Sequence, residues 1–237
     1  MMLSLTVMVI SASVVQCHEY YSGKCPDFSP MEDFDWGRFS GDWWAALKMN
    51  SRSSCIRYSY DLEDGERVVT ETKLLPVIGR FGVPSAVKSR GSLTSARPGG
   101  PSSLMEVVWN TGLVSSANAA VMGPLLSDTE YVILDTDYTD KALICSCRDL
   151  NMGFFAANRR SCAFLVRPTT DDVPVLLPED YTELLDQVTP DLALDMKRVR
   201  QDDCGDLESR PSLDLGHWWS LARDYGQSVA TMAAGWF

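Results

Sequence analysis

The chain has 237 residues, of which 45% are hydrophobic and 22% are charged, so it can bury a substantial core in one large or two small domains. Its formal net charge is -11, and its lysines and arginines do not gather in runs. A protein that binds nucleic acid needs a basic stripe against the phosphates, so this charge pattern excludes that class of partner.

The N-terminus, residues 1–17, has the pattern of a secretory signal peptide. It contains no charged side chain and carries an apolar run from Leu3 to Ile10, followed by small residues. We expect cleavage after Cys17, with cuts after Ala12 or Ser13 as alternatives. The apolar run is too short to span a bilayer, and no later segment approaches the roughly 18 apolar residues that a span requires. The sequence therefore predicts a secreted, extracellular protein that does not associate with membranes.

Short runs rich in β-branched and aromatic residues alternate with turn residues as far as about residue 167. Residues 55–61 and the run that begins at Glu66 flank Asp64-Gly65, a dipeptide typical of a tight hairpin turn. Further runs of this kind lie at 85–88, 104–110, 131–135, 141–148 and 161–167. An array of about eight antiparallel strands is best closed into a barrel, because closure removes the sheet edges. Residues 89–103 are so rich in Gly, Pro and Ser that we expect a mobile loop or a poorly ordered hairpin tip there.

After these predicted strands, the spacing of apolar residues changes to one typical of helices. Residues 178–188 begin with a proline and acidic residues and carry their apolar residues on one face, which predicts an amphipathic helix packed against the barrel. In the tail, apolar residues between 218 and 236 recur at spacings of three and four. We therefore expect a barrel domain at 18–204 and a helical C-terminal extension at 205–237. We expect this extension to pack on the outside of the barrel, with contact to a partner subunit or to a membrane surface as the alternatives; its one basic residue, Arg223, argues against the membrane.

Strand alternation predicts which side chains face the barrel interior. Tyr58 and Tyr60 share the face of the first long strand that carries its large apolar and aromatic groups, so we place that face inward. In the strand at 131–135 we take Val132 and Leu134 as inward, because Asp135 on the other face suits solvent better. Inward side chains either fill a barrel of this size or line a space for one small ligand.

Three separated motifs resemble those of the lipocalin family. Gly-Asp-Trp at 41–43 is similar to the first motif of the family, Thr-Asp-Tyr at 136–138 to the second, and Arg167 to an arginine that packs over the motif tryptophan. The resemblance implies the eight-stranded antiparallel up-and-down barrel of that family, closed at one end by a structural plug. The residues of this plug would be Gly41, Trp43, Thr136, Asp137, Tyr138 and Arg167. Gly41 would let the backbone approach closely, and Arg167 would make a cation–π contact with Trp43 worth about 1 kcal/mol or more.

Within the lipocalins the chain resembles the branch that contains apolipoprotein D, bilin-binding protein and crustacyanin. The resemblance rests on GKCP at 23–26, CIRYSY at 55–60, TDYTDKALICSC at 136–147 and LPEDY at 177–181, before a final cysteine. It implies two disulfides, Cys25 with Cys147 and Cys55 with Cys204. Alternation places the remaining pair, Cys145 and Cys162, outward on strands that flank one turn. We expect a third bridge there, with two free thiols as the alternative.

The resemblance further implies that the protein binds and transports a small hydrophobic ligand, such as a lipid, retinoid, carotenoid or bilin. Such a ligand would be held non-covalently by burial of its apolar surface, without a cofactor. The expected ligand contacts are Tyr58, Tyr60, Met105, Val107, Trp109, Val132, Leu134, Ala163 and Leu165. An alternative from another class is an interaction protein, such as a pigment-complex subunit or a cell-surface signalling lipocalin. It would work through its loops and tail helix, as a homo- or hetero-oligomer.

The sequence holds little that could support catalysis. Its two histidines, His18 and His217, lie at opposite ends of the chain, far from any nucleophile motif. Cys145 and Cys147 lack the two-residue spacing of a zinc-binding pair. We therefore expect neither catalytic residues nor a metal site, and we interpret the protein as a binding protein rather than an enzyme.

Overall fold

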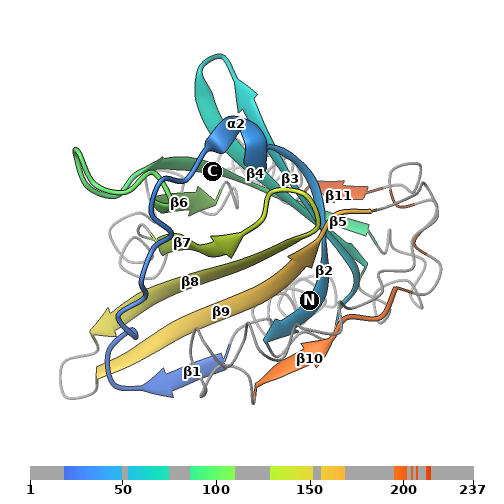
Figure 1. Cartoon of the computed structure of the whole chain (residues 1–237). Coiled ribbons are helices and arrows are strands. Elements are labelled where there is room, and N and C mark those ends of the chain that lie inside the picture. Colours follow the sequence, from blue (N-terminus) through green and yellow to red (C-terminus); the bar gives the residue numbers. More distant parts are fainter. Residues whose placement is uncertain are drawn as a thin grey trace, which may run out of the picture.

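Eight consecutive antiparallel strands form a closed barrel (Figure 1). The strands are β2 (Gly41–Met49), β3 (Ser54–Glu63), β4 (Glu66–Leu74), β5 (Ala86–Ser95), β6 (Leu104–Trp109), β7 (Thr129–Thr136), β8 (Lys141–Asn151) and β9 (Ala156–Val166). Each pairs with the next strand along the chain, and β9 returns to pair with β2. The predicted up-and-down barrel is confirmed.

The computed structural model describes residues 19–49, 53–74, 86–109, 129–151, 156–168 and 195–201, together with Cys204, Leu207 and 212–214. The predicted signal peptide, the amphipathic helix at 178–188 and the helical stripe at 218–236 lie outside these residues. Within the described ranges, no helix is long and apolar enough to cross a membrane.

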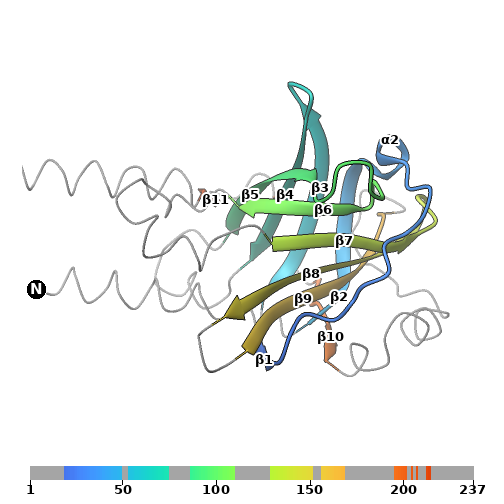
Figure 2. The same cartoon turned by 90° about the vertical axis from the view of Figure 1, so that its left-hand side faces the viewer.

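Among the residues that the structure describes, four short elements surround the barrel (Figure 2). β1 (Glu19–Ser22) pairs with β9, and β10 (Met196–Arg198) pairs with β2. β11 (Ser212–Asp214), which belongs to the C-terminal extension, lies parallel to β5. The helix α2 (Trp36–Phe39) lies at the end of the barrel where β7 and β8 are joined. Its N-cap is Asp35, whose side chain accepts a hydrogen bond from the backbone N–H of Arg38.

The expectation of a loose loop at 89–103 is wrong over its first half. Residues up to Ser95 belong to β5, which pairs with both β4 and β6. The glycine in this stretch helps β5 to pair with β6. A Cβ at Gly91 would lie only 2.7 Å from Cγ2 of Val107, so a larger residue at this position would clash with β6. A glycine thus makes room for the bulky inward side chains of β6.

The buried side chains form two clusters on opposite faces of the barrel wall. Residues that pair across neighbouring strands share a face, and the pairs Trp43 with Tyr58 and Tyr60 with Val69 define the inner cluster. The outer cluster contains Trp44, Phe164 and the cysteines, and Phe28 from the N-terminal segment packs onto it. The barrel wall is therefore buried on both sides over much of its area.

Three disulfides fasten the outer face. Cys25 is joined to Cys147 and Cys55 to Cys204, the two pairs that the family resemblance implies. Cys145 is joined to Cys162, directly opposite on the neighbouring strand, with a Cα–Cα distance of 4.1 Å. The first two bridges tie the N-terminal segment and the segment after β10 to the barrel.

Candidate functional site

The closed end of the barrel is built around Trp43. The guanidinium carbon of Arg167 lies 4.1 Å from the centroid of the Trp43 ring, and the indole N–H of Trp43 donates to the carbonyl of Phe39 at 2.8 Å. The Phe39 ring stacks on Trp43 with a centroid distance of 5.1 Å. Arg167 also donates to the carbonyls of Arg38, Phe39 and Ser40 through Nη2 and to that of Tyr138 through Nε. This single side chain joins α2, the start of β2, the end of β9 and the β7–β8 turn.

Gly41 lies beside this contact in a conformation that favours glycine. Its φ is +103°, and a Cβ on it would lie 3.2 Å from Nη1 of Arg167. Both the backbone angle and the proximity of the guanidinium therefore require a residue without a side chain.

The Thr136-Asp137-Tyr138 segment forms the turn between β7 and β8. Oδ1 of Asp137 accepts hydrogen bonds from the backbone N–H groups of Thr139, Asp140 and Lys141. Burial alone would raise the pKa of Asp137, but these three donors hold it below its usual value. The Tyr138 hydroxyl accepts a hydrogen bond from the backbone N–H of Asp35, which fastens the turn to α2. The predicted plug residues therefore lie together at one end of the barrel.

Most of the predicted ligand contacts lie in the inner cluster. The residues found there are Tyr58, Tyr60, Met105, Val107, Ala163 and Leu165. Trp109 is partly buried and packs against the same cluster. These seven side chains therefore share the interior of the barrel, the part of the fold in which a ligand can be enclosed.

The predicted orientation of β7 is wrong for Val132 and Leu134, which belong to the outer cluster with the cysteines. Tyr131 and Ile133 take the inward positions instead. A register shift between Ile133 and Asp135 is the cause, because it breaks the alternation at Leu134. Asp135 does face outward, as expected. Because of the register shift, Ile133, two residues earlier, faces inward instead of sharing the outward face of Asp135.

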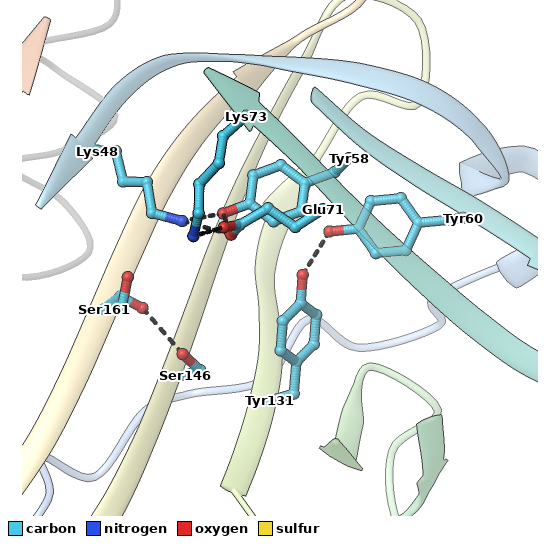
Figure 3. A network of polar contacts seen from close by, with 8 residues as sticks. All are labelled: Lys48, Tyr58, Tyr60, Glu71, Lys73, Tyr131, Ser146 and Ser161. Carbon is cyan, nitrogen blue, oxygen red and sulfur yellow. Dashed lines mark hydrogen bonds and ion pairs between the residues drawn. The ribbon is translucent and has the colours of Figure 1, made fainter. Parts of the chain in front are cut away.

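A buried group of charged and phenolic side chains lies in the barrel interior next to the aromatic residues (Figure 3). Oε2 of Glu71 accepts hydrogen bonds from Nζ of Lys48 at 2.8 Å and from the Tyr58 hydroxyl at 2.6 Å. Oε1 accepts from Nζ of Lys73 at 2.5 Å, and Nζ of Lys48 also contacts the Tyr58 hydroxyl. We call Lys48, Tyr58, Glu71 and Lys73 the interior polar group.

Electrostatics keep Glu71 ionised inside the barrel. Burial would raise the pKa of this carboxyl, but the ammonium groups of Lys48 and Lys73 outweigh burial and hold it well below its ordinary value. Burial and the nearby Glu71 carboxylate raise the pKa of Tyr58 well above 10.0. Tyr58 is therefore a neutral donor to a charged acceptor, which is the stronger kind of hydrogen bond.

Two further polar pairs lie in the interior (Figure 3). The hydroxyls of Tyr60 and Tyr131 are hydrogen-bonded to each other, and burial raises the pKa of both. The Ser146 hydroxyl donates to the carbonyl of Ser161 at 3.3 Å. The inward face thus combines apolar surface with hydroxyl, ammonium and carboxylate groups.

Sequence reasoning missed Lys48, Glu71 and Lys73. The alternation of β4 did contain a signal, because Glu71 and Lys73 follow Val69 at intervals of two. Charged residues in a strand are usually assigned to solvent, so that signal was overlooked. Lys48 gave no signal, since a register shift between Ala45 and Leu47 turns it inward.

Residues 75–85, between β4 and β5, and residues 110–128, between β6 and β7, lie outside the described residues. His18 and His217 also lie outside them. Within the part of the chain that the structure describes, no three His, Cys, Asp or Glu residues are grouped to hold a metal ion.

Comparison with known proteins finds similar sequences, although no family model matches the chain. Bilin-binding protein of Pieris brassicae is 34% identical over 42 residues, which are 18% of this chain and 22% of that protein. Apolipoprotein D of Cavia porcellus is 23% identical over 155 residues, which are 63% of this chain and 71% of that protein. The stretch shared with bilin-binding protein is thus far shorter than either chain.

Solved structures extend the likeness over most of the chain. Insecticyanin from the tobacco hornworm Manduca sexta superimposes with a TM-score of 0.54 at 18% identity, covering 84% of this chain and 96% of that one. Apocrustacyanin C1 superimposes with a TM-score of 0.51 at 19% identity, covering 81% and 93%. At these identities the structural likeness establishes the fold.

Proposed function

We propose that this chain, which has the lipocalin fold, is a secreted protein that binds and carries a small hydrophobic ligand inside its barrel. Its resemblance to the lipocalin family is confirmed by its likeness to bilin-binding protein, apolipoprotein D, crustacyanin and insecticyanin. One observation carries the proposal: the inward face of a barrel sealed at one end brings together aromatic, aliphatic and hydroxyl side chains. Burial of apolar surface would provide the affinity, and the hydroxyls would orient the guest.

Secretion is supported by the cysteines. The six cysteines beyond the predicted signal peptide are joined in three disulfides. Such bonds form and persist in oxidising compartments and are rare in the cytosol. This use of cysteine agrees with the signal peptide predicted at residues 1–17.

The proposed mechanism is enclosure without covalent chemistry or a cofactor. A thiol nucleophile would have to come from the six cysteines, and all six are in disulfides. The inward tyrosines have pKa values raised by burial, so they remain neutral hydrogen-bonding groups rather than bases.

Native mass spectrometry combined with an absorption spectrum of the secreted protein tests the proposal. A co-purifying apolar mass or a visible chromophore is the expected result, and it would give the class of the guest. Titration with retinoids, bilins and fatty acids, followed by tryptophan fluorescence, covers the case of a guest lost in purification. A protein that carries no guest and responds to none of these compounds would contradict the proposal.

Two neighbouring valines of β6 provide matched variants for locating the ligand. Val107 faces the inner cluster and is 1% exposed, whereas Val108 faces outward and is 46% exposed. We expect Val107→Trp to abolish ligand binding because the larger ring fills the interior, and Val108→Trp to bind as the wild type does. Equal binding by both variants, each with an intact thermal transition, would place the ligand outside the barrel.

The C-terminal extension was predicted either to pack on the barrel or to contact a partner. The pairing of Ser212–Asp214 with Ala86–Lys88 of β5 favours packing on the barrel for that part of the tail. We propose that residues 18–204 form the ligand-binding domain and that the extension is dispensable for binding. Truncation after Asp214 should leave ligand binding intact, and the mass of the truncated protein in solution shows whether an oligomer depended on residues 215–237.

A further inference from the structure

A hydrogen bond between two tyrosines crosses the interior of the barrel. The hydroxyl of Tyr60 on β3 is bonded to the hydroxyl of Tyr131 on β7 (Figure 3). In the closed order of the eight strands, β3 and β7 are separated by three strands in either direction around the barrel. The two side chains therefore extend from opposite walls and meet inside. We call this pair the tyrosine crossbar.

The Tyr60 end of the crossbar is held by the aromatic residues of the closed end. The centroid of the Tyr60 ring lies 4.8 Å from that of Phe39 and 5.9 Å from that of Trp36. Phe39 in turn stacks on Trp43. Tyr60 therefore cannot turn away from Tyr131 without disturbing the packing around Trp43.

The interior is filled between the crossbar and the closed end. Met105 lies opposite Tyr131 on the neighbouring strand, and Ile133 and Leu165 occupy inward positions nearer the closed end. All three side chains are 0% exposed, as are Phe39 and Trp43. Side chains that line a space wide enough for a guest keep part of their surface uncovered, and these side chains keep none. The described residues thus leave no room for a guest on this side of the crossbar.

On the other side of the crossbar, several inward side chains are small, polar and partly exposed. Ser146 pairs with Tyr131, and Ser161 pairs with Ser146 on the next strand. Along β6, the inward positions that follow Met105 away from the closed end are Val107 and then Trp109. Partly exposed inward residues on this side include Ser89, Trp109, Thr129, Ser146 and Ser161. The change from full burial to partial exposure therefore occurs at the crossbar.

We propose that the tyrosine crossbar is the floor of the ligand site, and that Tyr131 sets the greatest length of guest that the barrel encloses. This inference rests on the proposed function and specifies the size class of its ligand, a short apolar molecule. Of the predicted ligand contacts, Val107 and Trp109 would touch the guest, whereas Met105 and Leu165 would lie beneath the floor. The hydroxyls on the open side of the crossbar would bind a polar group at the outer end of the guest.

A series of straight-chain primary alcohols, from butanol to tetradecanol, tests the depth of the site. Each alcohol is titrated into the full-length secreted protein by isothermal calorimetry. Each methylene that enters the site should raise the affinity by about fourfold until the chain reaches the crossbar. Further methylenes should add nothing, because they remain in water. An affinity that rises through the longest alcohol would overturn the floor and leave the carrier function in place. Binding of no alcohol by the wild type would contradict both.

Variants of Tyr131 locate the floor. Tyr131→Ala and Tyr131→Leu each remove the side chain that reaches Tyr60, so affinity should continue to rise to longer alcohols than in the wild type. Tyr21→Ala is the matched control, because Tyr21 packs against the outer cluster and its hydroxyl donates to Asp195. This control should keep the wild-type limit.

Two outcomes would overturn the assignment of the floor to Tyr131. One is an unchanged limit in both Tyr131 variants, each with an intact thermal transition. The other is an equal increase of the limit in Tyr21→Ala. Tyr131→Leu keeps more of the apolar packing than Tyr131→Ala, so it provides the comparison if the alanine variant does not fold. The limit measured in the wild type tests the floor without any variant.

Discussion

The guanidinium of Arg167 lies over the ring of Trp43 and joins the first strand of the barrel to the end of the last. Four hydrogen bonds to backbone carbonyls hold Arg167 in this position. Because the carbonyls belong to α2 and the β7–β8 turn as well, the contact closes one end of the barrel and fixes the segments around it. The stability of the whole fold should therefore depend on this one side chain.

Arg167→Met should lower the free energy of unfolding by about 2–4 kcal/mol, through loss of the cation–π contact and of hydrogen bonds to partly buried carbonyls. Arg90→Met is the matched control, because Arg90 pairs with Glu63 at the surface, where their side chains are 52% and 43% exposed. An exposed pair of this kind contributes about 0–1 kcal/mol. Chemical denaturation of both variants measures the difference. If Arg167→Met and Arg90→Met lower the free energy of unfolding equally, then Arg167 contributes no more than an exposed surface charge.

Gly41→Ala should destabilise the protein by about 1–3 kcal/mol, since the new Cβ is strained by the positive φ and contacts Arg167. Gly99→Ala separates these two causes, because Gly99 has a φ of +74° and nothing within 4 Å of its added Cβ. We expect the larger loss at Gly41, measured by denaturation. If Gly99→Ala lowers the free energy of unfolding by as much as Gly41→Ala does, then backbone strain alone explains the requirement for glycine at position 41.

The barrel could be predicted from sequence because its signals are local. The Asp64-Gly65 turn specifies a hairpin through its backbone preferences, and the plug residues occur in short motifs. β5 was not predicted because its strand character comes from pairing with β4 and β6 and from the fit of Gly91 beside Val107, which are contacts distant in sequence. Local composition alone indicated a loop there.

The candidate site was harder to predict because alternation fails at register shifts. One shift turns Lys48 inward in β2, and another places Leu134 and Asp135 on the same outward face of β7. A bulge has no reliable signature in a single sequence. The inward charge at Glu71 followed the alternation but conflicted with the usual exposure of acids, and it becomes reasonable only once Lys48 and Lys73 are seen beside it.

The three disulfides should differ in what they contribute to stability. The closed loops span 17, 122 and 149 residues for Cys145–Cys162, Cys25–Cys147 and Cys55–Cys204. Chain-entropy estimates give about 3 kcal/mol for the shortest loop and about 5 kcal/mol for the longest. We therefore expect the smallest loss of unfolding free energy when Cys145 and Cys162 are both replaced by alanine. The largest loss should follow from replacing both Cys55 and Cys204 by alanine. Denaturation midpoints in the opposite order would mean that packing on the outer face, rather than loop length, controls the contribution.

The interior polar group should make stability depend on pH in the acid range. The pKa of Glu71 is lower in the folded protein than the ordinary value of 4.5 expected when the chain is unfolded. Below that value the unfolded chain binds more protons, so the stabilisation from Glu71 is fully present above about pH 4.5 and is lost as the pH falls through the folded-state pKa.

Glu71→Gln should remove this part of the pH dependence. We expect the free energy of unfolding of the wild type to fall more steeply than that of the variant between about pH 4.5 and pH 2, as measured by urea denaturation at several pH values. Added salt screens exposed charges but affects a buried pair much less, so the difference between the two proteins should persist at high ionic strength. Parallel curves would mean that Glu71 has the same proton affinity in both states, and thus that Lys48 and Lys73 do not hold it as an anion.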